Sequence, residues 1–252
     1  MGKVLLQGLL GVGEKIAIVD LPVVIDRLKT DNPHERVSFF SDYQKALTTF
    51  PEADIVLAVK PYQVANIMPA IKDRNLILSI VAGQDLQYYH SLTKKWNVVR
   101  VMTNVSAHLQ AAPIVLCGKR EEQPEALMQR ASQLFSSLGE VIVLEDEKQF
   151  NIVTAILGSG PALALEAVEG LALGGVRHGL PRDVSLKLGA YALLGAAQLV
   201  LKEAKSPTAL RDQICTPGGC TIAGVESLER DAFRGSLMKA IGGILDALKP
   251  PQ

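Results

Sequence analysis

The chain has 252 residues, of which 48% are hydrophobic and 21% charged, and its formal net charge at pH 7 is zero. A balanced charge gives no extended basic surface for nucleic acid or an anionic membrane. The three cysteines form no Cys-x-x-Cys pair and the four histidines are isolated, so neither a disulfide framework nor a metal site is indicated. No signal peptide and no charge-free run of transmembrane length is present. We therefore expect a cytoplasmic protein of one large domain or two small ones.

The first part of the chain alternates helical and strand patterns. Continuous apolar runs such as Ala53–Val59 are typical of strands in a parallel sheet. Strands that alternate with helices predict right-handed crossovers and a mainly parallel sheet. We expect helices over residues 2–10, 41–50, 64–71, 85–91 and 124–137, and strands over residues 15–20, 53–59, 76–81, 97–102, 113–117 and 140–144.

The strand pattern stops after Glu145, and the rest of the chain is helical and rich in Ala, Leu and Gly. We therefore predict an α/β domain over residues 1–146 and an all-α domain over residues 147–252.

A Pro-Gly-Gly turn in the helical part carries the strongest chemical signal. Pro217 fixes one φ angle, and Gly218 and Gly219 can adopt φ values that are closed to other residues. Backbone N–H groups of such a turn at a helix start favour an anion, and Thr221 adds a hydroxyl beside them. The turn would suit a small carboxylate with a polar neighbouring atom. The alternative is a plain turn that begins a helix.

The stretch around this turn resembles the signature of pyrroline-5-carboxylate reductases, and its residues resemble those of fungal members. Four other stretches agree with the family in the expected order: Ala58-Val-Lys-Pro61, Arg100-Val-Met-Thr-Asn104, Gly158-Ser-Gly-Pro-Ala162 and Gly179-Leu-Pro-Arg-Asp183. The resemblance implies a Rossmann-like N-terminal domain and a helical C-terminal domain that forms a homodimer, or an oligomer of dimers. It further implies hydride transfer from NADPH or NADH to 1-pyrroline-5-carboxylate, giving L-proline in the last step of its biosynthesis.

The start of the chain departs from the family pattern. Relatives begin with a strand and a Gly-x-Gly turn that ends in Met-Gly, and Met1-Gly2 matches the end of that turn. The resemblance therefore predicts that the first strand and most of the Gly-rich turn are absent here, with Gly2 kept beside the cofactor.

The resemblance implies a set of cofactor-binding residues. Asp20 ends the second family strand, where an acid bonds the ribose 2′-hydroxyl and favours NADH over NADPH. The alternative for Asp20 is a loop aspartate that caps the next turn. The other positions that match the cofactor site are Gly2, Ala58, Val59, Lys60, Pro61, Ala82, Asn104 and Gln213.

The resemblance also implies the substrate site. Gly218, Gly219 and Cys220 would hold the substrate carboxylate, and Thr221 would act in catalysis by hydrogen bonding the ring nitrogen. Glu147 matches a family carboxylate near bound proline, although a charge at a helix start is also normal.

Two other functions compete with this one. The first is a related reductase that acts on another imine or keto acid. The second is a non-catalytic helical oligomerisation protein with an incomplete cofactor domain, which the absent first strand favours.

Overall fold

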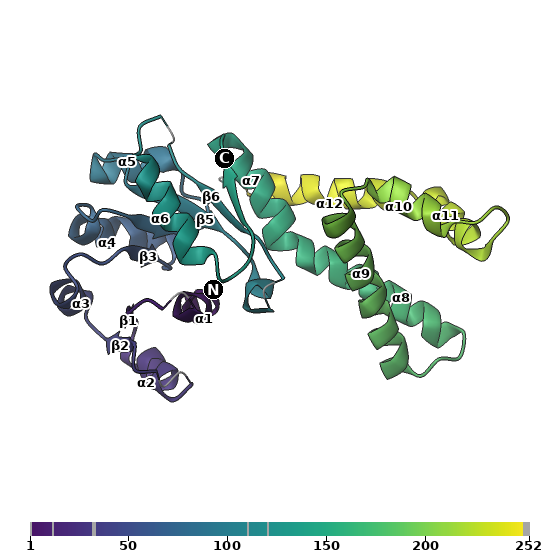
Figure 1. Cartoon of the computed structure of the whole chain (residues 1–252), viewed down its shortest axis with the longest axis horizontal. Coiled ribbons are helices and arrows are strands. Elements are labelled where there is room, and N and C mark those ends of the chain that lie inside the picture. Colours follow the sequence, from purple (N-terminus) through teal and green to yellow (C-terminus); the bar gives the residue numbers. More distant parts are fainter. Residues whose placement is uncertain (1, 12, 32–33, 110, 120, 249–252) are drawn as a thin grey trace. The chain divides into compact units, whose positions relative to one another are not determined.

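The computed structural model describes residues 2–11, 13–31, 34–109, 111–119 and 121–248. The chain forms two compact units, Met1–Gly158 and Ser159–Gln252 (Figure 1). From Glu147 onward the described chain forms helices and turns without strands, beginning with the 3₁₀ turn η3 (Glu147–Gln149), α7 (Phe150–Val153) and a π-helical turn (Thr154–Gly158). These three short segments belong to the first compact unit, beyond residue 146.

The strands of the first unit form two sheets. The smaller sheet pairs β1 (Ile16–Val19) with β2 (Val37–Phe40) in parallel. The larger has the order β3-β4-β5-β6-β7 and is parallel except between β5 and β6. Its strands are β3 (Ile55–Leu57), β4 (Ile77–Ser79), β5 (Val98–Met102), β6 (Ile114–Cys117) and β7 (Val141–Leu144).

Helices cover both faces of the larger sheet. Alternation along β4 explains this, because Leu76 and Leu78 face one hydrophobic core and Ile77 faces the other. The first core includes Leu5 of α1 (Gly2–Gly11) and Phe135 of α6 (Glu125–Phe135). The second includes residues of α4 (Val64–Ile71) and α5 (Leu86–Thr93). The α/β class and the Rossmann-like layering expected from the sequence are confirmed.

Side chains hold the two sheets together. No ladder hydrogen bond joins β1 to β3 among the described residues. Instead, Arg130 of α6 forms ion pairs of 2.9 Å with both Glu14, just before β1, and Asp54, just before β3. Ile16 also packs against the core that the larger sheet shares with α6.

The second unit is entirely helical over its described residues, as predicted. Its helices are α8 (Ser159–Arg177), α9 (Arg182–Glu203), α10 (Pro207–Ile214), α11 (Cys220–Arg230) and α12 (Phe233–Ala247). The first two lie side by side as a hairpin (Figure 1). Gly189 allows their close approach, because a Cβ there would lie 3.0 Å from the Val168 carbonyl oxygen.

Most large apolar side chains of the second unit are exposed within a single chain. In α9, only Ser185 and Gly189 are fully buried. By length and composition alone, two helical stretches, Glu147–Arg177 and Arg182–Glu203, could cross a membrane. The exposed apolar side chains of α8 and α9 are Leu165, Leu171, Leu173, Val176, Val184, Leu186, Leu188, Tyr191, Leu194, Leu199, Val200 and Leu201.

Candidate functional site

The Pro-Gly-Gly turn has the geometry expected from its sequence. The Gly219 N–H donates to the Thr216 carbonyl oxygen over 3.0 Å, and Gly218 has φ +70°. With Pro217 before it, this is a type II turn, which requires a positive φ at its third residue. Gly219 is then the N-cap of α11. The predicted turn and helix start are confirmed.

The start of α11 has free hydrogen-bonding capacity. Gly219 provides no side chain to cap the first N–H groups of the helix, and no side-chain cap bond is present. Cys220 and Thr221 occupy the first helical turn and are exposed. Because unpaired N–H groups at a helix start attract anions, this turn can receive a carboxylate with the Thr221 hydroxyl at its side. Gln213 is exposed on α10, the helix that precedes the turn.

The start of α1 lies beside the carboxyl end of β3. A Cβ placed on Gly2 would lie 3.9 Å from the Ala58 Cβ, so two of the predicted cofactor residues lie close together. Ala58, Lys60 and Pro61 are exposed, and the Lys60 N–H donates to the Gln63 side chain over 3.1 Å. Ala82 is also exposed, in the loop after β4. Ligands in open α/β sheets bind at this edge, and small exposed residues leave room for one.

Two other predicted cofactor residues make local hydrogen bonds. The exposed Asp20 carboxylate accepts the N–H of the next residue, Leu21, over 2.7 Å, in the loop after β1. Asn104 is buried, and its Nδ2 donates to the Leu157 carbonyl oxygen over 2.8 Å. Its Oδ1 accepts the Ser106 N–H over 2.8 Å. Asn104 therefore fixes backbone at the end of β5, whatever else it contacts.

Glu147 is held by a buried cation and a helix start. Its Oε1 accepts from Arg100 Nη1 over 2.8 Å and from the Leu86 N–H over 2.7 Å. Arg100 is only 6% exposed, and its guanidinium lies 3.8 Å from the centre of the Phe150 ring. Arg100 is the first residue of the motif Arg100-Val-Met-Thr-Asn104, but the sequence alone indicated no role for it. A charged residue inside the apolar run of β5 was the available signal.

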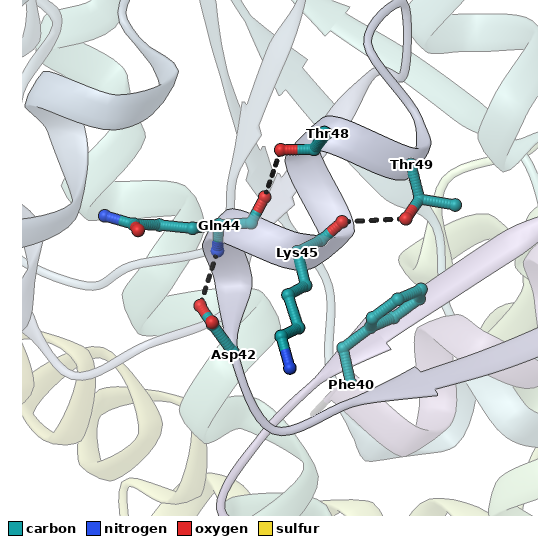
Figure 2. Close-up of a pocket in the computed structure, with 6 residues that line it drawn as sticks. All are labelled: Phe40, Asp42, Gln44, Lys45, Thr48 and Thr49. Carbon is teal, nitrogen blue, oxygen red and sulfur yellow. Dashed lines mark hydrogen bonds between the residues drawn. The ribbon is translucent and has the colours of Figure 1, made fainter.

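A shallow hollow of about 490 Å³ lies where β2 leads into α3 (Tyr43–Thr49) (Figure 2). Figure 2 shows that its hydroxyls and its carboxylate bond to the backbone of α3 itself. It contains one carboxylate and one ammonium group, so it has no net charge to select an ion. Its lining residues are Phe40, Asp42, Gln44, Lys45, Thr48 and Thr49.

A layered α/β unit with an open edge at the strand carboxyl ends, together with an all-helical unit, is an architecture typical of dinucleotide-dependent oxidoreductases. Residues 147–249 match the family model for pyrroline-5-carboxylate reductase dimerisation. The chain is 39% identical to the pyrroline-5-carboxylate reductase of Glycine max over 196 residues, 75% of this chain and 70% of the relative. It is 36% identical to human pyrroline-5-carboxylate reductase 2 over 206 residues, 77% and 62% of the two chains.

Solved structures agree with the sequence comparison. The pyrroline-5-carboxylate reductase of Coxiella burnetii superposes with a TM-score of 0.86 at 25% identity, covering 98% of this chain and 93% of that one. The NADP-bound enzyme of Plasmodium falciparum gives 0.79 at 26% identity, covering 99% and 94%. The chain therefore belongs to the pyrroline-5-carboxylate reductase family.

Proposed function

We propose that this chain, as a homodimer, transfers hydride from NADPH or NADH to 1-pyrroline-5-carboxylate and releases L-proline. Family membership makes it an NAD(P)H-dependent oxidoreductase that acts on the CH–NH group. The single observation that supports the substrate is the uncapped start of α11 behind the Thr216–Gly219 turn. We place the reaction in the cytoplasm, as the composition suggests.

Cofactor binding and dimerisation are assigned to different domains of the chain. We propose a dinucleotide-binding domain over residues 1–146 and a dimerisation and substrate domain over residues 147–252. The family model begins at residue 147, which supports this boundary, although Glu147 to Gly158 pack within the first compact unit.

The small exposed residues at the strand carboxyl ends fit a dinucleotide. The start of α1 at Gly2 would receive its phosphates, because helix N-termini favour anions. The bound cofactor supplies the hydride. The other cofactor contacts that we propose are Asp20, Ala58, Val59, Lys60, Pro61, Ala82, Asn104 and Gln213.

The substrate turn would orient the imine. The Gly218 and Cys220 N–H groups hold the carboxylate, and Thr221 hydrogen bonds the ring nitrogen. Gly219 lies between them and closes the turn, with its own N–H bonded to the Thr216 carbonyl oxygen. As the imine carbon accepts hydride, the C=N double bond becomes single and the nitrogen gains a proton from water. Holding the ring at reacting distance and angle makes the transfer effectively unimolecular and so lowers its barrier. Glu147 is left out of these substrate contacts, because its Oε1 is already paired with Arg100 and with the Leu86 N–H.

Substitution of Thr221 tests the substrate assignment. Thr221→Val keeps the side-chain volume and removes the hydroxyl, so turnover should fall by about 10²–10³. The dissociation constant of NADPH should stay within about twofold, because Thr221 is assigned to the substrate alone. Turnover is measured from NADPH oxidation with 1-pyrroline-5-carboxylate, and cofactor affinity from fluorescence.

Thr208→Val is the matched control, because Thr208 is an exposed threonine on α10, outside the turn. Wild-type turnover in Thr221→Val would show that the hydroxyl has no catalytic role. Absence of any turnover in the wild type would reject the proposed function.

A further inference from the structure

Glu147 joins three segments that are far apart in sequence. Its Oε1 receives the Leu86 N–H, 61 residues away, and Arg100 Nη1, 47 residues away. Both bonds involve a charged group, and such bonds are shorter and stronger than neutral ones. One carboxylate oxygen therefore connects η3 to the start of α5 and to the middle of β5.

The position of Glu147 is itself fixed. Arg100 is almost fully buried, so its charge needs a partner in place, and Glu147 Oε1 is the carboxylate that it meets. The guanidinium is held from another side by the face of Phe150, three residues after Glu147. Glu147 is 27% exposed, so water screens this pair only in part.

The segment that Glu147 anchors is the loop between β4 and α5. The loop leaves β4 at Ser79, whose hydroxyl is 2.6 Å from the buried Tyr89 hydroxyl and accepts the Val81 N–H over 3.3 Å. At its other end the Asp85 carboxylate accepts the Tyr88 N–H over 2.6 Å. Between these ends Gly83 has φ +75°, a backbone conformation that few other residues adopt.

The conformation of the middle of this loop is determined by the positions of its two ends. Ala82 and Gly83 are exposed, so their path is set by where β4 stops and where α5 starts. Asp85 caps α5 only from within the same loop, whereas Glu147 holds the first residue of α5 from outside it. Loss of the Glu147 bond would leave the Leu86 N–H unpaired and let the helix start shift.

We propose that Glu147 is a positioning residue: with Arg100 it fixes the start of α5 and so the loop Ala82–Asp85 against the dinucleotide. The inference rests on the proposed function in one respect, that this loop faces the cofactor. It assigns Glu147 a role in cofactor affinity, where the family resemblance assigned it to the substrate.

Glu147→Gln tests the proposal in the full chain. The variant keeps the size of the side chain and removes the charge that pairs with Arg100. The bond to the Leu86 N–H also loses its charge and becomes the weaker, neutral kind. The KM for NADPH should rise about tenfold, with kcat and the KM for 1-pyrroline-5-carboxylate within about twofold of wild type. Hydrogen–deuterium exchange should be faster over residues 82–88 and unchanged over β6. Glu140→Gln, at an exposed glutamate before β7, is the control and should change none of these values.

Each outcome decides between roles. Faster exchange in the loop with weaker NADPH binding supports the proposal. A raised KM for 1-pyrroline-5-carboxylate with unchanged NADPH affinity overturns it in favour of direct substrate contact. Unchanged exchange over residues 82–88 also overturns it, and so does a wild-type chain that binds no dinucleotide. A wild type that binds NADPH without turnover refutes only the proposed function, and NADPH affinity and exchange then decide the role of Glu147.

Discussion

Individual buried polar side chains in the first unit form hydrogen bonds to backbone groups that regular secondary structure leaves unpaired. Asn97 Nδ2 donates to the Lys72 and Arg74 carbonyl oxygens over 3.0 and 2.7 Å. Asn104 does the same between the end of β5 and Leu157. Because a buried unpaired carbonyl is costly, such residues hold loops in one conformation. The motif Arg100-Val-Met-Thr-Asn104 thus has a structural role at both ends.

Cys117 provides a prediction about pH. Burial at the end of β6 raises the pKa of its thiol to about 11. In the unfolded chain the thiol ionises near pH 9, so between pH 9 and 11 only the unfolded state loses this proton. Stability from this group is therefore complete below pH 9 and lost as the pH rises, by roughly 2 kcal/mol at pH 11.

Urea denaturation of wild type and Cys117→Ala at pH 8, 9 and 10.5 measures this effect. The variant should be less stable at pH 8, because a cavity replaces the sulfur, yet should lose less stability as the pH rises. If stability fell equally with pH in the two proteins, Cys117 would not be a buried, neutral thiol.

Iodoacetamide at pH 8 should label the exposed Cys220 well before Cys117.

At the scale of elements, long periodic or strongly apolar segments were predictable from the sequence, and short amphipathic ones were not. The expected strands over residues 76–81 and 97–102 contain β4 and β5, whose residues are nearly all buried. The helix α2 (Pro22–Asp31) was missed, because among its described side chains only Ile25 is fully buried. The strand β2 was missed too, since four residues carry little alternation.

In the candidate site, local backbone geometry was predictable from the sequence, and contacts between distant residues were not. The Pro-Gly-Gly turn follows from local sequence, because proline and glycine dictate backbone angles by themselves. The partners of Glu147 did not follow, because Leu86 and Arg100 reach it only through the fold. A pairing across 47 or 61 residues leaves no periodic trace in one sequence.

The hairpin of α8 and α9 yields an element-scale prediction. A Cβ on Gly189 would approach the Val168 carbonyl oxygen and the Leu171 Cβ to 3.0 and 3.2 Å. Gly189→Val adds further methyl groups at this contact, so the helices must separate. We expect a loss of about 1–3 kcal/mol in the free energy of unfolding, measured by urea denaturation followed by circular dichroism.

Ser185→Ala is the matched control in the same contact between helices. The Ser185 hydroxyl is buried without a hydrogen-bond partner, so its removal should leave stability unchanged or raise it slightly. Equal losses of stability in both variants would show that the contact between α8 and α9 tolerates no substitution. Wild-type stability in Gly189→Val would show that the two helices are not closely packed.

At the scale of the whole molecule, the apolar surface of the helical unit needs a cover. A single chain leaves most large side chains of α8 and α9 exposed, including Leu188, Tyr191 and Leu194. Large apolar side chains exposed in this number on two packed helices mark an interaction site. The match of residues 147–249 to the family's dimerisation model identifies a second copy of the chain as that cover. This accounts for helices that are long and apolar enough, by composition alone, to cross a membrane.

A charge on this surface should separate the two copies. In Leu194→Asp a carboxylate replaces an exposed leucine of α9, and closing the dimer would bury that charge without a partner, at a cost of several kcal/mol. Light scattering should give about 54 kDa for the wild type, twice the 27.1 kDa of one chain, or a multiple of it. Leu194→Asp should be monomeric at micromolar concentration and lose reductase activity, because the helices that present the substrate turn lose their support.

Lys202→Asp, on the same helix at a position that is already charged, should keep the wild-type mass. A wild type that is monomeric at micromolar concentration would overturn the assignment of this surface, and a dimeric Leu194→Asp would place the interface on other helices of the unit.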